Sequence, residues 1–97
     1  MSVKALIKLK AQKGKGVALL SALTQPLAAS RANPDCREAG LFMGAESPDE
    51  LVLIEEWASV EAHRKHLLEL EAGATMAEVN ELLAAPLEVH HYSRIAE

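Results

Sequence analysis

Hydrophobic and polar residues alternate along the chain with two different periods, and each period predicts one kind of element. Residues 3–10 alternate apolar positions with lysines, and this period of two predicts a strand with one buried face. Between residues 16 and 31 the apolar positions are spaced by three or four, which predicts a helix. Pro26 cannot donate a hydrogen bond to the carbonyl group of Ala22, so this helix should bend or weaken there.

The middle of the chain predicts a β-hairpin. Residues 33–35, Asn-Pro-Asp, stop the first helix, and residues 36–45 read as a strand. Residues 51–58, Leu-Val-Leu-Ile-Glu-Glu-Trp-Ala, form the strongest strand pattern of the chain. The Ser-Pro-Asp turn at residues 47–49 is short, so the two strands should pair as a hairpin.

Two helices and a last strand are predicted for the remainder. Ser59 can cap a helix that Gly73 ends or breaks. Residues 75–78, Thr-Met-Ala-Glu, fit a capping box for a third, short helix, which Pro86 ends. Residues 87–95 alternate again and predict the final strand.

The order of these elements predicts the fold class. It is α+β: a single ferredoxin-like βαββαβ domain over residues 1–97, with a four-stranded antiparallel sheet and helices on one face. Apolar residues also lie on the other face, at Leu6, Val52 and Ile54. A partly apolar sheet face usually packs on a second sheet, so we expect a homodimer that associates through its sheet faces.

Composition and charge exclude several classes of function. Aromatic residues make up 3% of the chain and the net charge is −4, which argues against a nucleic-acid-binding surface. The lone Cys36 excludes an internal disulfide and a site with several thiolate ligands. No stretch resembles a membrane span or a signal peptide, so we expect a soluble cytoplasmic protein that does not bind membranes.

Glu55 and Trp57 are the first candidates for chemistry. They lie two residues apart on the strongest strand and therefore face the same side, together with two leucines. A carboxyl group in such surroundings needs a fixed partner, a raised pKa or a place at the open end of the sheet. Two interpretations remain open here, a pocket acid or base and a structural glutamate that binds a helix end or a lysine.

The four histidines form two pairs in the sequence. His63 and His66 are neighbours on one helix, with His63 in its apolar stripe and His66 at the flank of that stripe. His90 and His91 point to opposite sides of the last strand, and His91 shares its side with two apolar residues. Although histidine and carboxylate side chains can bind metals, the chain contains no metal-binding motif, and we expect no metal.

Three stretches of the chain share their order and register with motifs of a known family. They are the turn Ser-Arg-Ala-Asn-Pro-Asp-Cys at residues 30–36, the strand Leu-Ile-Glu-Glu-Trp-Ala-Ser at 53–59 and the helix Glu-Ala-His-Arg-Lys-His at 61–66. In them the chain resembles the antibiotic-biosynthesis-monooxygenase (ABM) domain, a branch of the dimeric α/β-barrel superfamily. The resemblance covers nearly the whole chain.

The resemblance implies a homodimer whose sheets form a barrel, and a small-molecule pocket between helices and sheet in each protomer. It implies oxidation of a small quinol-like or electron-rich aromatic substrate by O₂ without a cofactor. By position, His66 would be the catalytic base or proton shuttle, and Glu55 would orient a histidine or act on the substrate. Trp57 would form a wall of the pocket.

Three further residues are expected to contribute to substrate binding, namely His63, Met43 and His91. His63 stands where the family usually has an apolar residue. Two other functions remain open: a proton-shuttling isomerase or lyase that acts on a small lactone or sugar-derived ketone, and a non-catalytic dimeric binding protein. The scarcity of aromatic rings favours a small or only partly aromatic substrate over a large polyketide.

Overall fold

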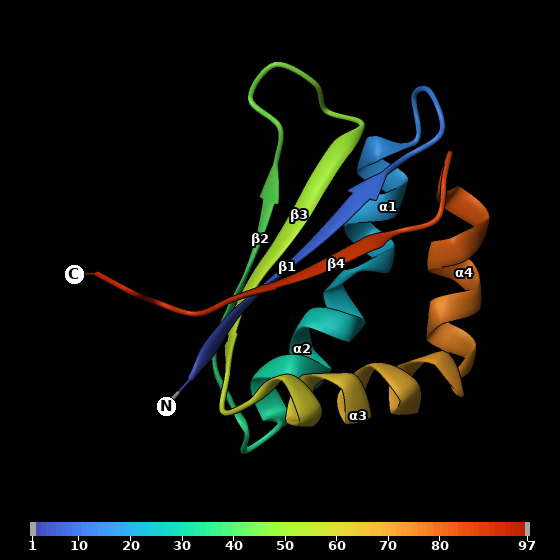
Figure 1. Cartoon of the computed structure of the whole chain (residues 1–97). Helices are drawn as coiled ribbons and strands as arrows, with labels where there is room; N and C mark the ends of the chain where they lie inside the picture. The colour runs from blue at the N-terminus through green and yellow to red at the C-terminus, as the bar shows by residue number, and fades with distance from the viewer. Residues whose placement is uncertain (1, 97) are drawn as a thin grey trace.

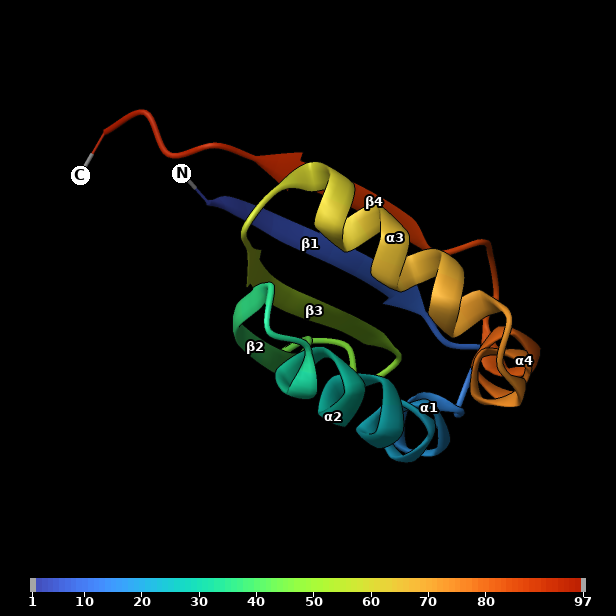
Figure 2. The same cartoon turned by 90° about the horizontal axis from the view of Figure 1, so that it is seen from below.

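Four strands and four helices follow one another in the computed structural model, which describes residues 2–96 (Figure 1). In chain order they are β1 (Val3–Lys10), α1 (Gly16–Ala22), α2 (Thr24–Ala32), β2 (Cys36–Met43), β3 (Glu50–Trp57), α3 (Val60–Glu71), α4 (Ala74–Leu82) and β4 (Glu88–Tyr92). The strands form one antiparallel sheet in the order β2-β3-β1-β4. All four helices lie on one side of this sheet (Figures 1 and 2), so the predicted ferredoxin-like α+β fold is confirmed.

The first helical segment differs from its prediction. It is interrupted at Leu23, three residues before Pro26, and forms the two helices α1 and α2. Pro26 thereby falls in the first turn of α2, where a helix leaves its N–H groups unpaired and proline costs little. α2 ends at Ala32, and its C-cap Asn33 has the extended backbone that the following Pro34 favours.

The second half of the chain confirms one predicted cap and corrects another. Ser59 caps α3, because its Oγ accepts a hydrogen bond from the N–H of Ala62 at 3.0 Å. The predicted capping box at residues 75–78 is wrong: α4 begins at Ala74, after Gly73, without a side-chain cap. Thr75 therefore lies inside the helix.

Two element ends also differ from prediction. α4 ends at Leu82, well before Pro86, because the next residue, Leu83, forms an isolated bridge with Ala11 beyond the end of β1. The last strand ends at Tyr92 instead of Ile95, whose side chain is 98% exposed. The alternating pattern at the C-terminus therefore continues past the last residue that pairs with β1.

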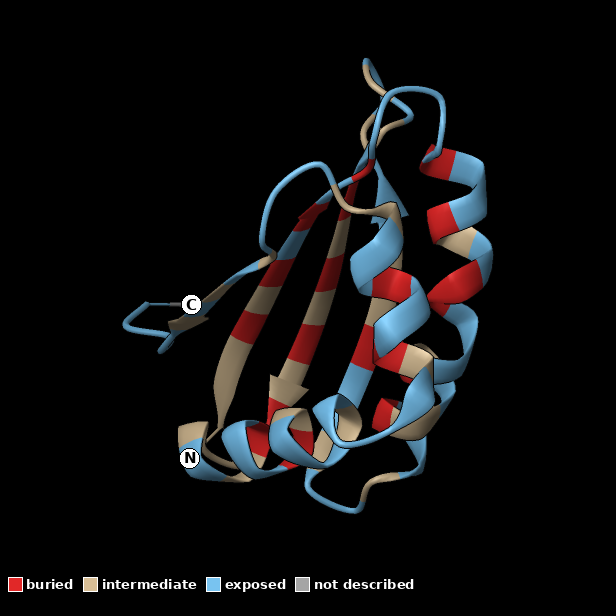
Figure 3. Cartoon of the chain, turned by 90° about the vertical axis from the view of Figure 1, so that its right-hand side faces the viewer, coloured by how far each residue is buried: buried red, intermediate tan, exposed pale blue. Residues whose placement is uncertain are grey.

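Burial alternates along the central strands, as the period of two predicts (Figure 3). On β3 the buried positions are Leu51, Leu53, Glu55 and Trp57, which face the helices, and β1 contributes its own alternating buried set to the same core. The described helices include none that combines the length and the hydropathy needed to cross a bilayer.

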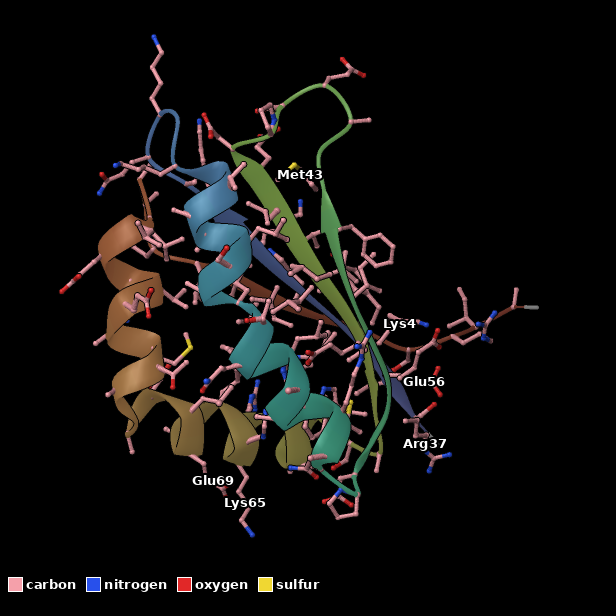
Figure 4. All side chains as sticks on the ribbon, turned by 180° about the vertical axis from the view of Figure 1, so that it is seen from behind. Lys4, Arg37, Met43, Glu56, Lys65 and Glu69 are labelled. Carbon is pink, nitrogen blue, oxygen red and sulfur yellow. The ribbon has the colours of Figure 1, made fainter. Side chains whose placement is uncertain are left out.

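The outer face of the sheet is apolar at its centre and charged at its ends. Leu6 pairs with Ile54 in the register of β1 and β3, and both are only partly buried. Phe42 on the neighbouring β2 is 52% exposed. Lys4 and Glu56 lie on the side away from the helices (Figure 4), with Nζ and Oε1 3.7 Å apart.

Candidate active site

Glu55 and Trp57 form a buried hydrogen-bonded pair on β3. Glu55 is 3% exposed and Trp57 is fully buried, and the indole Nε1–H donates to Glu55 Oε1 at 2.9 Å. The two side chains meet because they are separated by two positions on a strand and therefore share a face. The indole supplies one of the polar partners that a carboxyl group needs in an apolar interior.

His63 is fully buried on α3, beside this pair. Its Nε2 lies 3.5 Å from Glu55 Oε1 without forming a hydrogen bond, and this nitrogen is buried and unpaired among the described residues. Burial above all, and then the proximity of His91 and His66, lowers the pKa of His63 to about 4. At neutral pH the contact therefore joins an uncharged imidazole to a carboxyl group and is not an ion pair.

His91 on β4 is the direct partner of His63. Its Nε2 lies 2.8 Å from His63 Nδ1, with the two rings nearly edge to face. Burial is the main cause that lowers the pKa of His91, followed by the positive charge of Arg64 and by His90. β4 is an edge strand, so His91 connects the interior to the rim of the sheet.

His66 lies one turn further along α3 and is held by the end of α2. Its exposed fraction is 6%, and its ring lies 4.9 Å from the Trp57 ring, measured between centroids. Nε2 is 3.3 Å from Ser30 Oγ, and Nδ1 is 3.4 Å from Asn33 Nδ2. Sequence reasoning did not identify Ser30 and Asn33 as site residues, because only the packing of α2 against α3 brings them to His66.

The Asn33 contacts indicate which nitrogen of His66 carries hydrogen. Asn33 Oδ1 accepts a hydrogen bond from the N–H of Asp35 at 2.9 Å, which turns the amide NH₂ group toward His66. His66 Nδ1 then accepts, and a neutral His66 carries its hydrogen on Nε2 and donates it to Ser30. Proton acceptance at Nδ1 would require this ring to release Asn33.

A small cavity lies between the sheet and the helices at this cluster. Its volume is about 30 Å³, room for one or two water molecules. Its polar end consists of Ser30, Glu55, His63 and His66. The rest of its lining is apolar and comprises Ile7, Leu9, Leu23, Pro26, Leu53, Leu67, Leu70, Met76 and Leu87. The cluster therefore places acid–base groups at one end of an apolar chamber.

An open groove lies outside the cavity, between the end of α2 and α3. It has a volume of about 370 Å³ and is lined by Ala29, Ala32, Asn33, Pro34, His66, Glu69 and Leu70. His66, Leu70 and no other residue line both the groove and the inner cavity. These two side chains therefore lie between the chamber and the groove.

The structure brings together most of the residues that the sequence singled out. Trp57 and His91 contact the cluster without lining the cavity. Met43 lies elsewhere: it is 37% exposed at the end of β2 remote from α3 (Figure 4), and it does not line the cavity. Within residues 2–96, no three histidine, cysteine or acidic side chains are grouped in a way that could hold a metal ion.

Comparisons with solved structures identify the same fold over the whole chain. Rv0793 from Mycobacterium tuberculosis is 26% identical, with a TM-score of 0.80 over 100% of this chain and 98% of that one. PA3566 from Pseudomonas aeruginosa is 21% identical, with a TM-score of 0.80 and coverage of 98% and 95%. SnoaB, a cofactor-independent oxygenase from Streptomyces nogalater, is 14% identical, with a TM-score of 0.82 and coverage of 99% and 95%.

Family membership follows from the sequence itself. A search of curated proteins finds no significant match. The family model described as antibiotic biosynthesis monooxygenase matches residues 2–78, which include β1 to β3 and the cluster residues of α3. The chain therefore belongs to the antibiotic biosynthesis monooxygenase family.

Proposed function

We propose that this protein oxidises a small, electron-rich, quinol-like substrate with O₂, without a cofactor of its own. The observation that carries the proposal is the position of Glu55, His63 and His66 at the polar end of an otherwise apolar chamber. The family and the fold shared with SnoaB support the same reaction class. The aliphatic character of the lining is chemically suited to a small or only partly aromatic substrate.

The chemistry needs a base and a dry chamber. Removal of a proton from the substrate leaves an anion that is electron-rich enough to transfer an electron to O₂. When oxygen is inserted at a ring C–H of a quinol, one oxygen atom stays on that carbon and the product is a hydroxyquinone. The other oxygen atom leaves as water with two hydrogens of the quinol. In this scheme His66 is the base or proton shuttle at the entrance, and Glu55 is the buried acid–base group that Trp57 orients.

The test is O₂ uptake with a menadiol-type quinol, followed by mass analysis of the product. His66→Ala should reduce turnover by about 10²-fold or more, because a positioned base contributes a factor of that order. Lys65→Ala, an exposed neighbour on α3, is the matched control and should retain activity. Near-full activity of His66→Ala would exclude His66 as the base.

A proton-transfer reaction without O₂ is the second candidate. The contact of His63 with His91 favours it, since paired imidazoles beside a carboxyl group can move protons in an isomerase or lyase as well. Exchange of substrate hydrogen with deuterium from solvent, in the absence of O₂ uptake, would distinguish this reaction from oxidation. Ligand binding without turnover, unchanged in His66→Ala, would indicate a binding protein.

We also propose that the protein forms a homodimer through the outer face of its sheet. Leu6, Val52 and Ile54 form a partly exposed apolar centre there, with Phe42 beside them. Burial of this centre against a second copy would remove apolar surface from water without covering the cavity, which lies on the opposite face.

A further inference from the structure

Three residues from three elements form a continuous chain of contacts from the interior to the rim of the sheet. Glu55 on β3 is buried, His63 on α3 is fully buried, and His91 on the edge strand β4 is half-buried. His63 Nε2 lies 3.5 Å from Glu55 Oε1, and His63 Nδ1 lies 2.8 Å from His91 Nε2. Each ring nitrogen of His63 therefore faces a different titratable group.

We propose that Glu55, His63 and His91 form a proton relay, which exchanges protons between buried Glu55 and solvent at the edge of β4. The inference rests on the proposed function, in which Glu55 gains and loses protons inside the largely apolar chamber. His91 is the outer end, because its Nδ1 has no hydrogen-bond partner among residues 2–96 and is not buried.

The hydrogens can move along this path in one coordinated step. With the Glu55 carboxylate beside it, neutral His63 carries its hydrogen on Nε2, and its Nδ1 accepts from His91 Nε2–H. A proton then enters at Nδ1 of His91, the Nε2 hydrogen of His91 moves to His63 Nδ1, and the Nε2 hydrogen of His63 moves to Glu55. One proton has moved inward, both imidazoles are neutral again, and the reverse sequence carries a proton outward.

The surroundings of His63 and His91 favour transfer of a proton through a neutral imidazole ring over a lasting positive charge on either ring. His63 packs against Trp57 and faces His66 on its own helix, and burial opposes a lasting positive charge on it. The charge of Arg64 on α3 and, more weakly, His90 on the other side of its own strand also favour the neutral form of His91. A ring that accepts a proton on one nitrogen while it releases one from the other never has to carry a lasting positive charge in the interior.

The contact of His63 with Glu55 is the longest step of the path. At 3.5 Å it exceeds the usual length of an N–H···O hydrogen bond. Both side chains line the small cavity, which has room for one bridging water molecule. His66 offers no equivalent path from Glu55, because its ring nitrogens pair with Ser30 and Asn33.

Trp57 provides a readout of this path that does not depend on turnover. It is the only tryptophan, its indole donates to Glu55, and its ring lies 5.1 Å from that of His63. Its fluorescence should therefore change when the buried groups are protonated. In a stopped-flow jump from neutral pH to pH of about 4, where His63 is half protonated, the phase that disappears in His63→Gln reports proton arrival at His63.

The variants for this experiment differ in whether position 91 can pass a proton. His91→Gln should slow the His63 phase by roughly tenfold or more, because an amide cannot shuttle protons. His90→Gln, on the opposite face of the same strand, should leave the rate unchanged. His91→Ala should be equally slow, and added imidazole should restore the rate, which gives a second test if the glutamine variant does not fold.

A wild-type rate in His91→Gln, or in His91→Ala without imidazole, would overturn the relay. So would a His90→Gln variant that is as slow as His91→Gln, because the effect would then belong to the strand and not to the ring. The measurement needs no substrate. Absence of quinol oxidation would therefore leave the relay testable, and failure of the relay would leave the oxidation assay unaffected.

Discussion

A fully buried histidine in contact with a carboxyl group is the most unusual residue of this molecule. His63 lies in the apolar stripe of α3, and its Nε2 is unpaired among the described residues. Its burial disfavours the charged form. The protein therefore keeps a titratable ring in its core at the expense of stability in acid.

The lowered pKa of His63 predicts a specific pH dependence of the free energy of unfolding. The pKa of His63 is about 4 in the folded protein and about 6.5 in the unfolded chain, so between these values the unfolded chain binds more protons. The free energy of unfolding should be unaffected by His63 above pH of about 6.5 and should fall by at most about 3 kcal/mol as the pH decreases toward 4. Urea unfolding at a series of pH values measures this slope.

His63→Leu is the comparison for this slope, because leucine fills the same apolar position without titrating. The variant should lose the His63 contribution and retain those of other groups, including His91. If wild type and His63→Leu show the same dependence between pH 7 and 4, His63 is not held neutral by the fold.

The hydrophobic pattern of the sequence predicted correctly which side chains share the buried face of a strand. It predicted only some of the residues that contact one another in the candidate active site. The period of two placed Glu55 and Trp57 on one buried face, because strand geometry leaves no other arrangement. Ser30 and Asn33 reach His66 across more than thirty positions of sequence, and no local period encodes such a contact. Met43 follows the buried alternation of β2, but its side chain at the end of the strand is 37% exposed.

At the scale of elements, α3 positions the site. Its N-cap, Ser59, follows the end of β3 by only two residues. The strand that carries Glu55 and Trp57 therefore leads almost at once into the helix that carries the two histidines. The leucine spacing of residues 16–31 continues through Leu23, which explains why the sequence predicted one helix where the chain forms two.

The cap of α3 should contribute measurably to stability. Ser59→Ala removes the acceptor for the Ala62 N–H and should lower the free energy of unfolding by about 1 kcal/mol. Ser59→Thr keeps a hydroxyl acceptor and should lose less. Chemical denaturation of the three proteins checks this order, and an alanine variant as stable as wild type would contradict the role of the cap.

At the scale of the whole molecule, the two faces of the sheet differ in what they carry. One face holds the core and the candidate active site, and the other presents an apolar centre with charged ends. The helices shield only the first face (Figure 1). A second copy on the outer face would complete the burial of the sheet without altering the cluster.

Light scattering should therefore give twice the chain mass of 10.5 kDa at micromolar concentration. Ile54→Glu places a charge at the apolar centre and should yield monomers that remain folded by circular dichroism, since a charge is costly to bury unpaired. Lys65→Glu, on the exposed side of α3, is the control and should remain dimeric. A wild-type monomer would refute the interface.

The small volume of the inner cavity has a thermodynamic consequence. A chamber of about 30 Å³ is far below the several hundred Å³ that small-molecule sites usually offer, so a quinol-sized ligand needs a more open conformation. If that conformation is a minor fraction of the population, the apparent dissociation constant exceeds the intrinsic one by the inverse of that fraction. Substitutions that shrink Leu70 or Leu67 at the chamber wall would then tighten binding by making the open form more common, although they remove contacts.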